Sequence, residues 1–116
     1  EIFRRIHRIY FKDYDPEKHD RVLEDVVFRA DALNRSTFAC LPEYDVTDRL
    51  GEIRTPTLVL SGVADWITPP DHGGARVADE IPGAEHVVFK ESGHWPFVEE
   101  NERFLAVVRD WLAGRA

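Results

Sequence analysis

The sequence is poor in cysteine and in basic residues, and it has no long apolar run. Its single cysteine, Cys40, excludes an intrachain disulfide and fits a reducing compartment, so we expect a cytoplasmic protein. The 15 Lys and Arg against 22 Asp and Glu give a net charge of −7, which argues against a nucleic-acid binder held by phosphate contacts. No run approaches the roughly 20 apolar residues of a membrane helix. We therefore expect neither nucleic acid nor a membrane as a partner.

The remaining composition is that of a folded domain. Of its 116 residues, 43% are hydrophobic and 11% aromatic, enough to build a packed core and to exclude disorder. Methionine is absent and the chain begins with Glu1, from which we expect a piece of a longer product. The five histidines show no paired ligand spacing, so we expect no metal and no organic cofactor.

The first part of the chain, residues 1–43, has a helical pattern. Asp15 followed by Pro16 is typical of a helix start, and we expect a helix over residues 16–34. Cys40 is expected to be a small buried apolar side chain. Apolar residues at helical spacing form two stripes, of which the second lies on one face of the expected helix: Ile2, Phe3, Ile6, Ile9 and Tyr10 in the first, and Val22, Leu23, Val26, Val27, Ala30 and Leu33 in the second.

The second part, residues 44–116, alternates between strands and helices. The apolar runs 57–60 and 86–89 predict strands buried in a parallel sheet. Helices are expected over 71–81 and 101–113, and this order implies a right-handed parallel crossover. The side chains expected to face the core are Ala75, Ala78 and Ile81 in the first helix, and Phe104, Leu105, Val108, Trp111 and Leu112 in the second.

Two loops follow the predicted strands and carry the candidate chemistry. In an open parallel sheet, catalytic groups lie in loops at the carboxyl ends of the strands. Asp65 is in the first loop and His94 is in the second, 29 positions later. We expect the crossover to bring them side by side, where a carboxylate accepting Nδ1–H would leave Nε2 of the imidazole free to take a proton from a hydroxyl. Taken alone, an Asp or a Gly-His in a loop is more often structural.

At these residues the sequence resembles the α/β-hydrolase superfamily. The resemblance covers roughly residues 44–113 and rests on Pro56-Thr57-Leu58-Val59-Leu60-Ser61-Gly62 running to Asp65, and on Glu91-Ser92-Gly93-His94-Trp95-Pro96-Phe97-Val98-Glu99-Glu100. It implies an α/β fold, with the chain forming the C-terminal portion of a hydrolase. It also implies that Asp65 is the triad acid and His94 the general base. Trp66 and Trp95 adjoin the pair and are candidates to bind substrate.

Residues 1–43 resemble the end of a helical cap inserted before these strands. Together with the segment 45–50, they are similar to proline iminopeptidases and related serine aminopeptidases. The resemblance implies a small-molecule or short peptide substrate whose free amino group is bound by cap carboxylates. The candidates are Glu17, Glu24, Asp25, Asp31 and Glu43. Esterases and carbon–carbon bond hydrolases with similar caps remain open.

The nucleophile of such an enzyme is missing from the sequence. No Gly-x-Ser-x-Gly motif occurs, and Ser36, Ser61 and Ser92 lack the flanking glycines. The triplet 72–74, His-Gly-Gly, mimics an oxyanion loop but lies at the wrong place in the fold. We therefore expect the chain alone to be inactive, and to associate with itself or with a missing N-terminal segment through an open sheet edge. The alternative is a non-catalytic binding module on a hydrolase scaffold.

Overall fold

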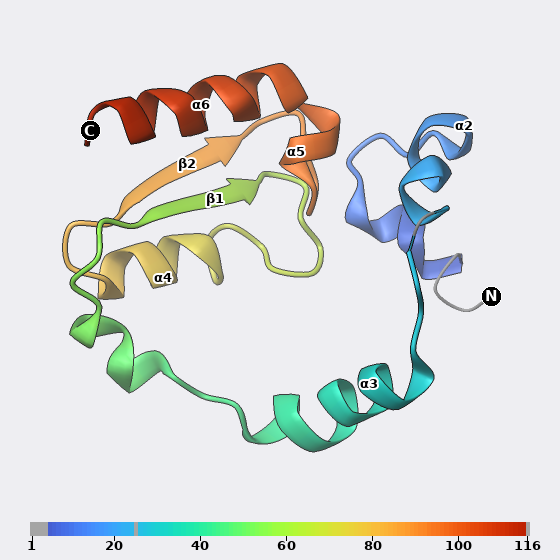
Figure 1. Cartoon of the computed structure of the whole chain (residues 1–116), viewed down its shortest axis with the longest axis horizontal. Helices are drawn as coiled ribbons and strands as arrows, with labels where there is room; N and C mark the ends of the chain where they lie inside the picture. The colour runs from blue at the N-terminus through green and yellow to red at the C-terminus, as the bar shows by residue number, and fades with distance from the viewer. Residues whose placement is uncertain (1–4, 25, 116) are drawn as a thin grey trace.

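The computed structural model of the chain describes residues 5–24 and 26–115 (Figure 1). The predicted positions Ile2, Phe3 and Asp25 lie outside the described residues, as does the side chain of Val22. The helices and strands in chain order are η1 (His7–Tyr10), α2 (Pro16–His19), η2 (Asp20–Leu23), α3 (Ala30–Arg35), η3 (Ser36–Cys40), η4 (Leu41–Glu43), η5 (Thr47–Glu52), β1 (Leu58–Gly62), α4 (Gly74–Glu80), β2 (Glu85–Phe89), α5 (Pro96–Glu99) and α6 (Asn101–Ala113).

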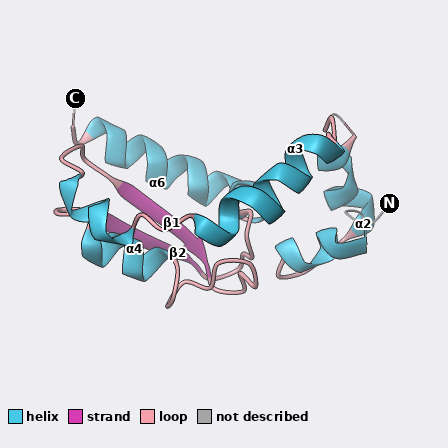
Figure 2. Ribbon diagram, turned by 90° about the horizontal axis from the view of Figure 1, so that it is seen from below, coloured by secondary structure: helices cyan, strands magenta, loops and turns pink. Residues whose placement is uncertain are grey.

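The two strands form a parallel sheet, as the sequence predicted. Leu58 pairs with Glu85 at one end, and Gly62 pairs with Phe89 at the other. Helix α4 lies on one side of the strands and α6 on the other, which both views show (Figures 1 and 2). Ile81 and Phe89 are buried. The ring centroids of Phe89 and of Phe104 on α6 are 6.2 Å apart. This α/β layering places the carboxyl ends of both strands at one edge.

The two crossover helices differ from the prediction in detail. Helix α6 spans the predicted residues, but Leu105 and Leu112 are exposed because the two-stranded sheet covers only a narrow stripe of the helix. Helix α4 begins at Gly74 rather than at residue 71. The preceding residues form a turn instead, in which the carbonyl of Pro69 accepts the N–H of Gly73 at 2.7 Å.

The prediction of one long helix over 16–34 is wrong. The start is as expected, since the Asp15 carboxylate accepts the N–H of Glu17 and Pro16 is the first helical residue. After Leu23, however, the helical turns stop, and residues 26–29 have no regular structure before α3 begins. Leu23 is buried, while side chains later in the stripe are exposed: Val26, Val27, Ala30 and Leu33. Apolar residues at helical spacing favour a buried helix face only where another element packs on it, and no described residue packs on the face beyond Leu23.

The burial prediction for Cys40 is also wrong. Cys40 is exposed. It lies in the helical segment 30–43, which makes few contacts with the sheet. Ile6 and Ile9 are each more than 40% exposed, whereas His7 and Phe11 are buried. The aromatic and histidine side chains pack against one another instead, with the Phe11 ring stacked 4.1 Å from the His19 ring. Residues 5–24 thus form a small cluster beside the carboxyl ends of the strands (Figure 1).

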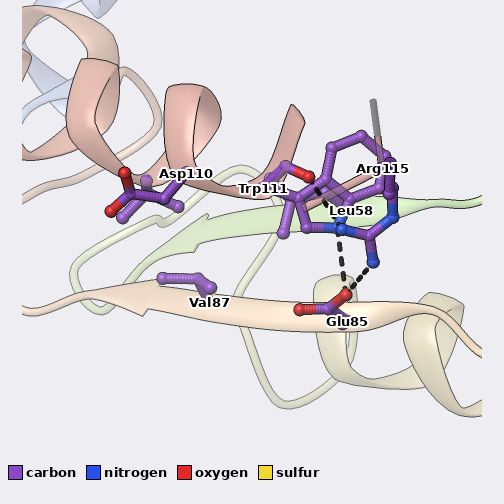
Figure 3. A pocket seen from close by; sticks show the side chains of 7 residues that line it. Leu58, Glu85, Val87, Asp110, Trp111 and Arg115 are labelled. Carbon is purple, nitrogen blue, oxygen red and sulfur yellow. Dashed lines mark hydrogen bonds and ion pairs between the residues drawn. The ribbon is translucent and has the colours of Figure 1, made fainter. Parts of the chain in front are cut away.

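A pocket of about 370 Å³ lies at the opposite end of the sheet (Figure 3). Trp111, predicted to be core, is only half-buried there, and its indole N–H donates to the Glu85 carboxylate at 3.1 Å. The labelled lining residues are Leu58, Glu85, Val87, Asp110, Trp111 and Arg115. Among the helices of the described ranges, none is both long and apolar enough to cross a membrane.

Candidate active site

Asp65 is held in a tight turn just after β1. One carboxylate oxygen, Oδ1, accepts the backbone N–H groups of Ile67 at 2.8 Å and Thr68 at 2.9 Å. The other, Oδ2, accepts the hydroxyl of Thr68 at 2.8 Å. Asp65 is 7% exposed, so these bonds replace the water that a buried carboxylate loses. The turn therefore fixes the direction in which the carboxylate points.

His94 meets this carboxylate from the loop after β2. Its Nδ1 lies 2.8 Å from Oδ2 of Asp65, as the topology predicted. With Nδ1–H as the donor, the lone pair of the neutral ring is on Nε2, and no described residue bonds to that atom. The His94 side chain is 29% exposed, so part of the imidazole is open to solvent.

The hydrogen bonds around Asp65 keep it ionised. Burial by itself raises the pKa of Asp65, but the Thr68 N–H, the His94 ring and the other donors together lower it below its ordinary value. A permanent negative charge beside Nδ1 favours the tautomer with the proton on Nδ1 and stabilises the imidazolium that forms when Nε2 accepts a proton.

The two loops are joined by their backbones. The N–H of Val63 donates to the carbonyl of Phe89 at 2.9 Å, and the N–H of Ala64 donates to that of Ser92 at 3.0 Å. Gly62 packs so closely on this loop that a Cβ there would lie 2.8 Å from the carbonyl carbon of Gly93. The backbone itself thus brings the two side chains within hydrogen-bonding distance.

Three contributors to the site escaped the sequence prediction. The Tyr10 carbonyl accepts the His94 backbone N–H at 2.7 Å, and the Tyr10 ring lies edge-on to the imidazole with centroids 5.2 Å apart. Glu99 accepts the Gly93 N–H at 2.7 Å. Only Thr68 had a local signal, because an Asp often accepts bonds from residues two and three positions later in a turn. Tyr10 comes from the first part of the chain, whereas Glu99 meets Gly93 from the nearby helix α5, and apolar spacing marks neither contact.

The other predicted site residues are spread more widely. Trp66 is 79% exposed, whereas Trp95 is half-buried between the rings of His7, Tyr10 and Phe11. Among the described residues, the carboxylates predicted to bind a free amino group are all exposed, and Asp31 is paired with Arg29. They are Glu17, Glu24, Asp31 and Glu43. Within the described ranges, no group of three or more His, Cys, Asp or Glu residues could hold a metal ion.

The His-Gly-Gly triplet has a packing explanation. A Cβ on Gly74 would collide with the Ser61 hydroxyl and lie 2.8 Å from Nε2 of His86. These two side chains form a hydrogen-bonded pair of 2.9 Å beneath the start of α4. Ser92 is fully buried and donates to Glu100 at 2.7 Å, a local structural bond.

Comparison with known proteins agrees with this arrangement. Residues 9–101 match the model of the alpha/beta hydrolase fold family. The chain belongs to the α/β-hydrolase fold family. It is 43% identical over 72 residues to a proline iminopeptidase of Clostridioides difficile (strain 630), a match that covers 62% of this chain and 24% of the relative. It is 38% identical over 73 residues to a proline iminopeptidase of Lactiplantibacillus plantarum, covering 63% and 25%.

Solved α/β-hydrolases show the same fold over most of the chain. A hydrolase from Bacillus anthracis str. Sterne superposes with a TM-score of 0.77 at 29% identity, covering 93% of this chain and 39% of that protein. A thermophilic esterase from Thermogutta terrifontis gives 0.58 at 40% identity, covering 60% and 25%. The chain thus spans about a quarter of the length of these proline iminopeptidases. Its homologues in the family are hydrolases.

Proposed function

We propose that this chain supplies the acid and the general base of a serine-type hydrolase. The observation that carries the proposal is the 2.8 Å contact between Nδ1 of His94 and Oδ2 of the buried Asp65. Two features support it further: no described residue bonds to Nε2 of the partly exposed His94, and the order of acid before histidine is that of α/β-hydrolases.

In the proposed reaction His94 moves one proton in each half of the cycle. Its Nε2 takes the proton of a serine hydroxyl while the serine oxygen bonds to the substrate carbonyl carbon. The imidazolium then gives this proton to the leaving amine or alcohol as the carbonyl–leaving group bond breaks. A water molecule repeats both transfers and releases the acid. Asp65 stays ionised throughout and holds the ring.

The serine of this scheme lies outside residues 1–116. None of the three serines is in a Gly-x-Ser-x-Gly motif. Ser61 and Ser92 are both buried, and their hydroxyls form hydrogen bonds with His86 and Glu100. We therefore propose that the chain works as part of a longer hydrolase and is inactive alone. Residues 1–43 would serve as the end of its cap and residues 44–116 as the C-terminal part of its core.

The proposed substrate is a small compound or short peptide with a scissile amide bond at its N-terminal residue. The support is the similarity to proteins named proline iminopeptidase, at 43% and 38% identity. The exposed cap carboxylates Glu17, Glu24 and Glu43 are available to bind a free amino group.

Ester cleavage is a second candidate. The Thermogutta terrifontis esterase is 40% identical over 60% of this chain, a match of the same quality as those to the peptidases. Both reactions need the same acid and base, so the site geometry does not separate them. A panel of aminoacyl anilides and short-acyl esters would: faster turnover of prolyl anilide favours the peptidase, and faster turnover of esters favours the esterase.

The test of the proposed chemistry is His94→Ala in the full-length hydrolase that contains this sequence. Loss of its general base should lower kcat/KM by several orders of magnitude. His72→Ala is the matched control, because His72 is an exposed histidine in a turn and is not among the hydrogen-bond partners of the Asp65 carboxylate. Unchanged turnover in the His94 variant would overturn the assignment and favour a non-catalytic binding module.

A further inference from the structure

We propose that Glu99 is a positioning residue for His94. Its carboxylate joins the loop that carries His94 to the segment 10–13 in the N-terminal cluster. This inference rests on the proposed function, since it assigns Glu99 a role through the general base.

The two oxygens of Glu99 accept donors from two distant parts of the chain. Oε2 accepts the N–H of Gly93 at 2.7 Å, directly before His94. Oε1 accepts the N–H of Lys12 at 2.8 Å, 87 positions away in the sequence. A single carboxylate therefore bridges these two segments, which the Lys12 side chain also joins through Glu91 and the carbonyl of Lys90.

The same two segments are joined again at His94 itself. The His94 N–H donates to the Tyr10 carbonyl at 2.7 Å. A Cβ on Gly93 would lie 3.0 Å from the backbone of Phe11, so the two backbones are in direct contact. The bonds to Tyr10 and to Glu99 hold adjacent peptide units of the loop. Together they orient the backbone from which the imidazole extends toward Asp65.

The neighbouring Glu100 has a different role. Its Oε2 accepts the N–H of Glu91 and the hydroxyl of Ser92, and its Oε1 pairs with Arg103. These bonds lie within the loop and α6, and they do not reach segment 10–13. Of the two consecutive glutamates, Glu99 alone connects the His94 loop to the N-terminal cluster.

The chemistry of the site requires a carboxylate at position 99. Each of its two oxygens accepts backbone N–H groups, Oε2 that of Gly93 and Oε1 those of Lys12 and Asp13, and an ionised carboxylate has two acceptor oxygens and no donor. In a glutamine, one of the two positions would be an NH₂ group facing an N–H. Glu99→Gln therefore loses at least one of the two bonds while keeping the size of the side chain.

The consequence for catalysis should fall on kcat. A small displacement of the imidazole lengthens the proton-transfer path, and a shift of about 1 Å can cost as much as ~10²-fold in rate. The Glu99 carboxylate bonds to backbone N–H groups and to none of the reacting groups of the proposed scheme. We expect Glu99→Gln to lower kcat about 10-fold or more and to leave KM within about twofold.

The experiment compares Glu99→Gln with Glu102→Gln in the full-length hydrolase. Glu102 is an exposed glutamate on the first turn of α6, so its variant controls for the change of charge. Kinetics are measured together with the NMR signal of the hydrogen-bonded Nδ1–H proton of His94. The inference predicts a lower kcat and a shifted or broadened proton signal for Glu99→Gln alone.

The possible outcomes are distinguishable. Wild-type kcat and an unchanged His94 signal in Glu99→Gln, in a hydrolase that His94→Ala inactivates, would overturn the inference and leave the proposed function standing. Unchanged turnover in His94→Ala would instead remove the proposed function, while the NMR signal would still report on positioning. If Glu99→Gln does not fold, Glu99→Asp keeps both acceptor oxygens, and its kcat should fall with KM near wild type; equal kcat would contradict the inference.

Discussion

Gly62 at the end of β1 packs directly against the carbonyl of Gly93 in the loop after β2. This contact allows the Asp65 and His94 loops to exchange backbone hydrogen bonds, and any side chain at position 62 would separate them. The backbones of the two loops are in contact at Gly62, where a Cβ would collide with the carbonyl oxygens of Ser92 and Gly93.

Gly62→Ala should therefore destabilise the fold by about 3 kcal/mol, because rigid backbone faces the new methyl group and must move. The measurement is urea unfolding of wild type and variant. Gly51→Ala is the matched control, since its nearest neighbour would be the carbonyl oxygen of Glu80 at 3.9 Å. Equal stability of the Gly62 variant would show that the loops are not in this contact.

Gly74→Ala should cost less, about 1–2 kcal/mol, because the atoms in its way belong to side chains that can rotate. The methyl group would disrupt the hydrogen bond between Ser61 and His86. In a Ser61→Ala background the cost should shrink, since the hydroxyl is already gone. Additive losses in the double variant would contradict this packing.

Asp65→Asn should lower kcat about 10³- to 10⁴-fold while His94 is still present. An asparagine supplies one acceptor oxygen, whereas the carboxylate serves the Ile67 and Thr68 N–H groups and the His94 ring at once. The His94 tautomer would then no longer be fixed. NMR of the ring nitrogens checks this directly, and an unchanged Nδ1–H signal would argue against it.

Stability should fall when the pH drops below about 6.5, through His19. Burial and the charge of Lys18 lower the pKa of His19 below its ordinary value, against the opposing charges of Glu99 and Asp15. Nδ1 already accepts the Asp15 N–H, so protonation there would break that bond. The unfolded chain then binds more protons than the folded one, and stability decreases as the pH falls from the unfolded pKa through the lower folded pKa.

Urea unfolding between pH 7.5 and 5 measures this dependence. His19→Gln removes the titrating group and keeps a hydrogen-bond acceptor, so its stability should vary less over the same range. A variant as pH-sensitive as wild type would assign the effect to another group.

The isolated 116-residue chain should self-associate. In the described part of the chain, β1 pairs only with β2, so its other edge presents unpaired N–H and C=O groups. Light scattering at micromolar concentration checks this expectation. A stable, well-folded monomer would contradict it.

The sequence predicted the part of the site that local patterns and topology determine. Apolar runs located both strands, and the rule for parallel sheets then placed Asp65 beside His94. The same approach failed for residues 16–34, because the apolar stripe there is covered only as far as Leu23. It also missed the role of Glu99. The partner Lys12 is 87 positions away, and no periodic pattern in the sequence indicates a contact over that separation.

The bond from His94 to the Tyr10 carbonyl bears on protein engineering. If residues 1–43 end a cap, as proposed, exchanging that cap for that of another hydrolase at a junction near residue 43 would also replace Tyr10 and Lys12. In such chimeras, residues of the other hydrolase would replace the Tyr10 and Lys12 contacts that hold the His94 loop. Placing the junction after Asp13 would keep the native scaffold of the histidine while exchanging the rest.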